Sequence, residues 1–193
     1  MDIIMKNNDR RFKRTEEALL NALAKLLEVK PLHKITVNEL VQLANLHRST
    51  FYIHYTDIYD LYHQTESKFF SVYENYVREC ATHDYTNVFH AILTYVDENR
   101  TTAGMFFGNN AEPSFCLQLT HFLTEQYVRI SAYEDNVTVV PEEWYSLASY
   151  HVGGMLNLLK TWIQSGYSVP KEKLIELYIE LDYSIAAFRH KTL

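Results

Sequence analysis

Apolar residues recur at helical spacing along nearly the whole chain, and this periodicity limits the possible folds more than any other feature. Residues 9–28, 57–80 and 171–188 each place leucines, tyrosines or other apolar side chains about 3.6 positions apart. The chain has only five glycines and four prolines in 193 residues. An all-β fold of short strands needs turn residues roughly every 8 to 12 positions. The sequence therefore predicts an all-α protein.

The first 56 residues predict three helices joined by short connections. The first helix ends before Pro31, because a proline disfavours helical backbone at the residue that precedes it. Thr36 and Glu39 have the spacing of a capping box, which predicts the start of a short second helix. Asn45 follows that helix and tolerates the left-handed backbone of a tight turn. A third short helix is then expected over residues 47–55.

The remaining residues, 57–193, predict a bundle of longer helices. Residues 103–114 interrupt the pattern with two glycines, one proline and two asparagines, and they predict a loop. Pro141 and Pro170 stand where two later helices are expected to begin. Gly166 stands where the first of these two helices is expected to end.

Charge is distributed unevenly between these two parts. The chain carries a net charge of −6, yet residues 1–56 contain nine lysines and arginines against six acids, and the rest contains nine against eighteen. A basic N-terminal part suits phosphate groups, whereas an acidic body does not.

Several classes of protein are disfavoured by the sequence. No apolar run approaches the ~18 residues of a membrane span, so no membrane association is expected. The N-terminus does not have the pattern of a secretory signal, and two cysteines imply no disulfide framework, so a cytoplasmic location is the default. We find no phosphate-binding loop or nucleophile motif of an enzyme, and expect no cofactor. The nine histidines lack metal-ligand spacing, so no metal site is expected.

The third helix carries residue types that can contact DNA. Two helices joined by a tight turn can place the N-terminal side chains of the second helix in the major groove. Arginine can bridge two acceptors of guanine, while serine and threonine can contact several bases. Arg48, Ser49 and Thr50 fit these roles, and Tyr52 and His54 on the same face suit phosphate oxygens.

Two stretches resemble a known family. ITVNELVQLANLHRSTFYIHYTDIYDLY, at residues 35–62, resembles the DNA-binding signature of the tetracycline-repressor family of bacterial regulators, and the match covers about residues 10–62. SYHVGGMLNLLKTWIQSGYSVPKEKL, at residues 149–174, resembles a C-terminal region found in a subset of this family. The resemblance implies a helix-turn-helix DNA-binding domain over residues 1–56 and a helical ligand-binding and dimerisation domain over residues 57–193.

The resemblance also implies what such a protein does. We expect a ligand-responsive regulator, most often a repressor in this family, that binds an inverted-repeat operator in double-stranded DNA as a homodimer. The expected DNA contacts are Thr36, Arg48, Ser49, Thr50, Tyr52 and His54. A small organic effector is expected in the body of the protein, against Tyr73, Tyr76, Phe106, Phe107, Phe122 and Tyr127. The expected dimer interface contains Gly153, Gly154, Leu156, Leu159, Ile163, Leu174, Leu177, Tyr178, Leu181 and Ile185.

Three positions depart from the family pattern. Asn45 stands where glycine is usual, His47 where a small helix cap is usual, and Ile58 where a lysine is common. The family includes coactivators of the same fold that act through a partner protein and do not bind DNA. The replaced lysine leaves this alternative function open.

Overall fold

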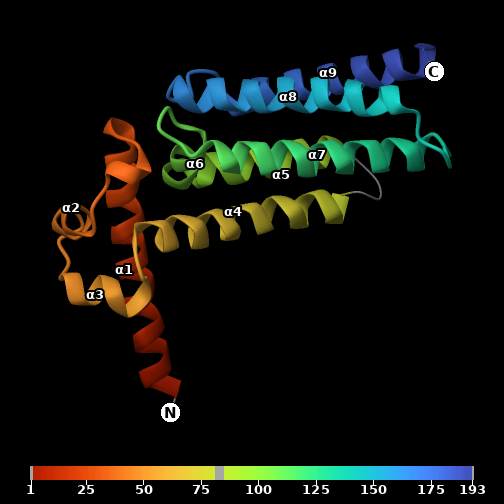
Figure 1. Ribbon diagram of the computed structural model, residues 1–193. Coiled ribbons are helices and arrows are strands. Elements are labelled where there is room, and N and C mark those ends of the chain that lie inside the picture. Colours follow the sequence, from red (N-terminus) through yellow and green to blue (C-terminus); the bar gives the residue numbers. More distant parts are fainter. Residues whose placement is uncertain (1, 81–84, 193) are drawn as a thin grey trace. The chain divides into compact units, whose positions relative to one another are not determined.

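The protein is helical throughout the described part of the chain. The computed structural model describes residues 2–80 and 85–192, and these ranges contain helices and turns without a strand. The prediction of an all-α fold is confirmed. In chain order the helices are α1 (Asp2–Val29), the short 3-10 helix η1 (Leu32–Lys34), α2 (Val37–Leu43), α3 (Arg48–His54), α4 (Ile58–Cys80), α5 (Tyr85–Glu98), α6 (Arg100–Phe107), α7 (Pro113–Glu134), α8 (Glu142–Gln164) and α9 (Lys171–Thr192) (Figure 1).

The chain packs as two compact units. The N-terminal unit comprises Met1–Lys68 and Thr101–Glu112, and the C-terminal unit comprises Phe69–Arg100 and Pro113–Leu193. The functional boundary after residue 56, expected from the family resemblance, stays a prediction. No helix of the described residues is long and apolar enough to cross a membrane.

The N-terminal unit is built on a core shared by its short helices. Leu19 and Leu23 of α1, Leu40 of α2, Phe51 of α3 and Leu61 of α4 are all fully buried. Burying a side chain of this size contributes about 1.5–3 kcal/mol. This core joins α1 to α2 and α2 to α3. Figure 1 shows α1 in red and the two short helices in orange.

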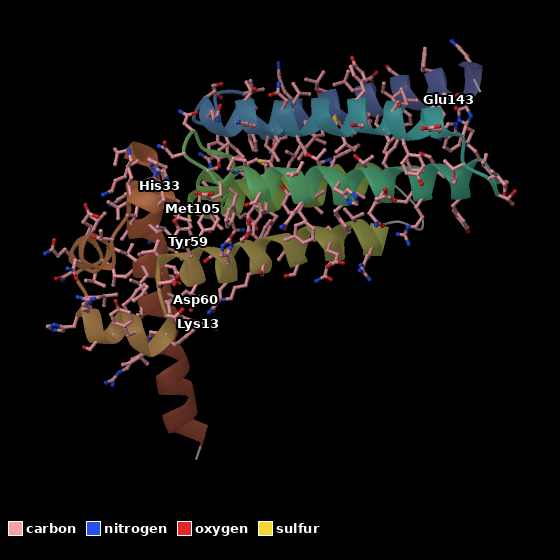
Figure 2. The ribbon with its side chains drawn as sticks, viewed as in Figure 1. Lys13, His33, Tyr59, Asp60, Met105 and Glu143 are labelled. Atoms are coloured by element: carbon pink, nitrogen blue, oxygen red, sulfur yellow. The ribbon has the colours of Figure 1, made fainter. Side chains whose placement is uncertain are left out.

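The loop predicted for residues 103–114 is wrong over its first half. Residues 100–107 form α6, and only the segment from Gly108 to Glu112 is non-helical. Ala103, Met105 and Phe106 are buried in the N-terminal unit, with Met105 labelled in Figure 2. Burial of these side chains outweighs the helix propensity lost at glycine, which is about 1 kcal/mol relative to alanine.

Gly108 closes α6 at a position where no side chain fits. Its N–H donates to the carbonyl oxygen of Gly104 over 2.9 Å. A Cβ atom at Gly108 would lie 2.4 Å from that same oxygen. The backbone of α6 would therefore have to move to admit any other residue.

Four helices of the C-terminal unit run side by side. α7 packs on α8 and α5 packs on α9 (Figure 1). α8 begins after Pro141, with Glu142 and Glu143 in its first turn, where acids interact favourably with the helix dipole (Figure 2). It ends before Gly166, whose φ of 69° is left-handed. The predicted helix start at Pro141 and the predicted end at Gly166 are both confirmed.

A buried arginine ties α9 to the end of α7. The Nε atom of Arg189 donates to Asp135 over 2.9 Å, and its Nη1 atom donates to the Ser131 hydroxyl over 2.6 Å. The guanidinium also lies 5.0 Å from the ring centre of Trp144 on α8. The guanidinium of Arg189 thus connects α9 to α7 and α8, and its charge is balanced by Asp135.

We predict that Gly108→Ala destabilises the N-terminal unit by about 1–3 kcal/mol, which is the usual cost of forcing extra atoms into a packed site. Gly104→Ala, four residues earlier within α6, is the control, because a Cβ there would meet nothing within 4 Å. Urea unfolding followed by circular dichroism measures both variants. Equal stability of the two variants would contradict the steric argument.

Candidate functional site

The capping box predicted at Thr36 is present and fixes the start of α2. The N–H of Glu39 donates to the Thr36 hydroxyl over 3.3 Å, and the Thr36 N–H donates to the Glu39 carboxylate over 3.0 Å. The ammonium of Lys30 donates to the same carboxylate over 2.7 Å. Hydrogen bonds from Lys30 and Thr36 lower the pKa of Glu39 to about 2.

The turn between α2 and α3 has the left-handed residue expected from the sequence. Asn45 has a φ of 54°. The next N–H, that of Leu46, donates to the carbonyl of Val41 over 2.9 Å, which is the bond pattern that closes a helix before a sharp turn. His47 then precedes α3 without a side-chain capping bond, as expected for a poor N-cap residue.

The outer face of α3 brings the predicted contact residues together. Arg48, Ser49 and Tyr52 are exposed, while Thr50 and His54 are half-buried. Phe51 and Tyr55, on the opposite face, are buried as expected. Ile53, which the sequence analysis did not single out, is also on the surface and is 75% exposed.

Arg48 and Tyr52 are joined on this face. The Nη2 atom of Arg48 donates to the Tyr52 hydroxyl oxygen over 3.1 Å, and the guanidinium carbon lies 5.3 Å from the ring centre. The bond uses the oxygen of Tyr52 as acceptor, so its O–H remains able to donate. His54 packs edge-on against Phe12 of α1, with ring centres 4.9 Å apart. Sequence spacing within one helix could not show that contact.

The first turn of α4 carries acids instead of the lysine common in the family. Ile58 is 5% exposed, so its side chain belongs to the core. Asp57 accepts from the N–H of Asp60, and Asp60 accepts from the N–H of Thr56, both over 2.8 Å. The Thr56 N–H lowers the pKa of Asp60 most. Figure 2 labels Asp60 and the neighbouring Tyr59 at this helix start.

A cavity of about 100 Å³ lies in the C-terminal unit. Its walls come from α4, α5, α7, α8 and α9. The lining residues are Tyr73, Val77, Val88, Phe89, Ile92, Leu93, Leu123, Gln126, Tyr127, Ile130, His151, Val152, Met155, Leu156, Leu159, Tyr178 and Asp182.

Two of the six predicted effector contacts line this cavity. They are Tyr73 and Tyr127, whereas Tyr76 is not in its wall. Phe122 lines a separate open groove with Phe70 and Leu117. Phe106 and Phe107 are buried in the other compact unit. The structure therefore brings together only part of the set.

The polar groups of the cavity wall were mostly missed by the sequence analysis. His151 and Asp182 form a pair, with 2.9 Å between Nε2 and Oδ1. The Tyr178 hydroxyl donates to the carbonyl of Met155 over 2.5 Å. His151 sits at an apolar position of α8, and a lone histidine in such a stripe gives no signal that its partner lies 31 residues away.

The predicted interface residues divide between the inside and the surface. Leu159, Ile163, Leu174 and Tyr178 are buried within the chain itself. Leu177, Leu181 and Gly154 are exposed, and Gly153, Leu156 and Ile185 are half-buried. Four further aromatic residues that the sequence analysis did not name are exposed on α8 and α9, namely Tyr145, Tyr150, Tyr183 and Phe188.

Comparison with known proteins decides the family. A family described as a transcriptional regulator C-terminal region, of the TetR type, matches residues 83–181, which is more than half of the chain. The chain belongs to the TetR family of transcriptional regulators. A search of curated protein sequences found no significant match.

Solved structures of two TetR-type proteins and of one further regulator share the fold. A TetR transcriptional regulator from Streptococcus agalactiae is 23% identical, with a TM-score of 0.60, and the match covers 92% of this chain and 98% of that one. A protein from Syntrophomonas wolfei assigned to the TetR family is 16% identical, with a TM-score of 0.64 and coverage of 91% and 96%. The fatty acid degradation regulator FadR from Bacillus halodurans is 10% identical, with a TM-score of 0.62 and coverage of 86% and 93%.

Membership of the TetR family makes this chain a regulator of transcription and not an enzyme. Within residues 2–80 and 85–192, histidine, cysteine, aspartate and glutamate side chains form no group of three or more that could hold a metal ion.

Glu39 makes the stability of the N-terminal unit depend on pH. Because its folded pKa is about 2 and its usual value is 4.5, its contribution is fully present above about pH 5 and is lost as the pH falls towards 2. We expect Glu39→Gln to be less stable than wild type at pH 7, with a difference that shrinks at low pH. Urea unfolding between pH 2.5 and 7 measures it, with Glu28→Gln, an exposed acid at the end of α1, as control. A difference that does not vary with pH would contradict the assignment.

Proposed function

We propose that the protein is a ligand-responsive DNA-binding regulator that acts as a homodimer on an inverted-repeat operator. The observation that carries this proposal is the outer face of α3, where Arg48 and Tyr52 stand exposed and already joined. Exposed arginine and hydroxyl groups at the start of the second helix of a helix-turn-helix are suited to the major groove.

Each side chain of this face has a proposed role. Arg48 bridges the two acceptors of a guanine, and Ser49 and Thr50 contact neighbouring base edges. Tyr52 donates its free O–H to a phosphate, and His54 contacts the backbone beside it. Thr36 acts first as the cap of α2, because its hydroxyl and its N–H are both bonded to Glu39. Its proposed contribution to DNA binding is therefore to place α2 beside the phosphate backbone.

The proposed dimer uses the outer faces of α8 and α9. Leu177, Leu181 and Phe188 lie on α9 with 43%, 37% and 54% of each side chain exposed. Gly153 and Gly154 lie on α8, and a Cβ atom at either would meet nothing within 4 Å in this chain. A glycine pair in mid-helix lowers helix propensity. A close approach by a partner helix, which larger side chains would block, would explain why glycines stand there. A two-fold pairing of both helices forms a four-helix bundle.

The same proposal has the protein act in the cytoplasm and repress transcription by occupying its operator. A small organic effector in the cavity of the C-terminal unit would then change its affinity for DNA. The mostly apolar wall of the cavity is the observation that supports an organic effector.

One observation favours a second function, that of a coactivator acting through a partner protein. The start of α4 offers the carboxylates of Asp57 and Asp60 where a phosphate-binding lysine is common, and Ile58 is buried. Ile53 adds an exposed aliphatic side chain to the face of α3. Carboxylates repel phosphates and an exposed isoleucine suits a protein surface.

DNA binding separates the two functions. With a site selected from random duplexes, we expect Arg48→Ala to lose about 1–3 kcal/mol on that site and little on a scrambled duplex. Tyr52→Phe should weaken both duplexes and also lose part of the specificity, because Arg48 loses its acceptor. Tyr133→Phe, an exposed tyrosine of the C-terminal unit, is the control. Fluorescence anisotropy measures all four proteins.

The salt dependence of binding is part of the same test. Affinity should fall steeply between about 50 and 200 mM salt if roughly six or more phosphates are contacted per dimer. If no duplex binds below about 10 µM at the lower salt concentration, the coactivator function replaces the DNA-binding one.

The dimer is tested by its mass in solution. Static light scattering at micromolar concentration should give twice the chain mass of 22.7 kDa. Leu181→Asp should give the monomer, because it places a charge on the apolar face of α9. Leu117→Asp is the control, since Leu117 is 73% exposed on α7. A wild-type mass of one chain would refute the dimer.

A further inference from the structure

Ile53 is a large aliphatic side chain that α3 holds in solvent. It is 75% exposed, whereas Phe51, two positions earlier, is fully buried. Successive residues of a helix are rotated by about 100°, so Ile53 lies about 160° around α3 from Phe51. It therefore points away from the core, in the middle of the outer face of this helix.

The helical neighbours of Ile53 on this face are hydroxyl residues. Ser49 and Thr50 precede it by four and three positions, which is the spacing of side chains that lie next to each other on a helix. Both are proposed to contact base edges. Among the seven residues of α3, Ile53 is the one exposed aliphatic side chain. The proposed base-reading surface thus has an apolar group at its centre.

The major groove offers one apolar group to such a side chain. Each base pair presents hydrogen-bond donors and acceptors there, and thymine adds its C5 methyl group. Isoleucine can neither donate nor accept a hydrogen bond, so it gains nothing from the polar groups. Packed against cytosine it would keep water from the N4 amino group without replacing the lost hydrogen bond. Ile53 is therefore suited to thymine.

The length of α3 limits which thymine Ile53 can reach. Ile53 follows Arg48 by five positions, which is about 7.5 Å along the helix axis. Consecutive base pairs are about 3.4 Å apart along a strand, so this distance corresponds to about two base-pair steps. The thymine should therefore lie within about three base pairs of the guanine that Arg48 is proposed to bridge.

The surroundings of Ile53 favour DNA over a protein partner. Protein interfaces concentrate their binding energy in clusters of large anchors, whereas Ile53 stands beside two small hydroxyl side chains. Residues 1–56 also carry nine lysines and arginines against six acids, which complements the charge of a phosphate backbone.

We propose that Ile53 determines sequence specificity by packing against the C5 methyl group of one thymine in each half-site. The inference rests on the proposed DNA-binding function and adds one base to those that α3 reads.

Replacing thymine by deoxyuridine in the DNA tests the contact. Deoxyuridine lacks the methyl group and still pairs with adenine. In the selected duplex, symmetry-related thymines are replaced one pair at a time, and fluorescence anisotropy measures the affinity of the full-length protein. One pair should weaken binding about 4-fold for each half-site, or about 15-fold in total, which is the usual effect of losing one buried methyl group at each of two places.

Variants of Ile53 identify the side chain that contacts the methyl group. Ile53→Ala should bind the thymine duplex about as weakly as the wild type binds the deoxyuridine duplex, and it should not distinguish the two. Ile53→Val keeps the branched side chain and should still distinguish them. Val29→Ala is the matched control, because Val29 is a 76% exposed aliphatic residue at the end of α1, and it should behave as the wild type does. Melting temperatures check that all variants are folded.

The other outcomes overturn the proposal in distinguishable ways. If Arg48→Ala weakens binding but no deoxyuridine pair does, or if the selected half-site lacks a thymine, the protein binds DNA without this contact. If Ile53→Ala still distinguishes thymine from deoxyuridine, another side chain contacts the methyl group. If no duplex binds at all, the proposed DNA-binding function itself fails, and Ile53 belongs to a protein-binding surface.

Discussion

The arrangement of α2 and α3 in the N-terminal unit depends on one residue in a left-handed conformation. Asn45, with a φ of 54°, turns the chain between α2 and α3 so that both helices can share the core around Phe51. A β-branched residue would be strained at this angle. This turn also sets the position of the side chains on the outer face of α3. The orientation of α3 that buries Phe51 leaves Arg48 and Tyr52 exposed.

The parts of the fold that follow from local chemistry could be predicted from the sequence. The capping box at Thr36, the turn at Asn45 and the helix end at Gly166 are each decided by the residue itself and its close neighbours. The helix α6 could not be predicted in this way. Gly104 within it and Gly108 after it indicate a loop, and only the buried surroundings of Phe106, supplied by distant residues, favour the helix.

The site residues also divide into those that the local sequence predicts and those that depend on how distant helices pack. The face of α3 is one short helix, so spacing alone places its side chains together. The cavity is made by five helices, and spacing cannot show which of their faces meet. The stripe on α9 has apolar residues on adjoining faces, with Leu174 and Tyr178 turned inward and Leu177 and Leu181 turned outward. A sequence pattern does not distinguish a chain's own core from a surface suited to a partner.

The bond between Arg48 and Tyr52 has a consequence for the entropy of recognition. A free arginine on a surface samples many rotamers, and ordering such a side chain in a complex costs about 0.5–1.5 kcal/mol. Here the guanidinium is held by a hydroxyl one helical turn away and lies 5.3 Å from the centre of the ring. Part of that ordering is complete before any partner arrives. Whichever surface α3 meets, the chain presents Arg48 as a preorganised group instead of a flexible one.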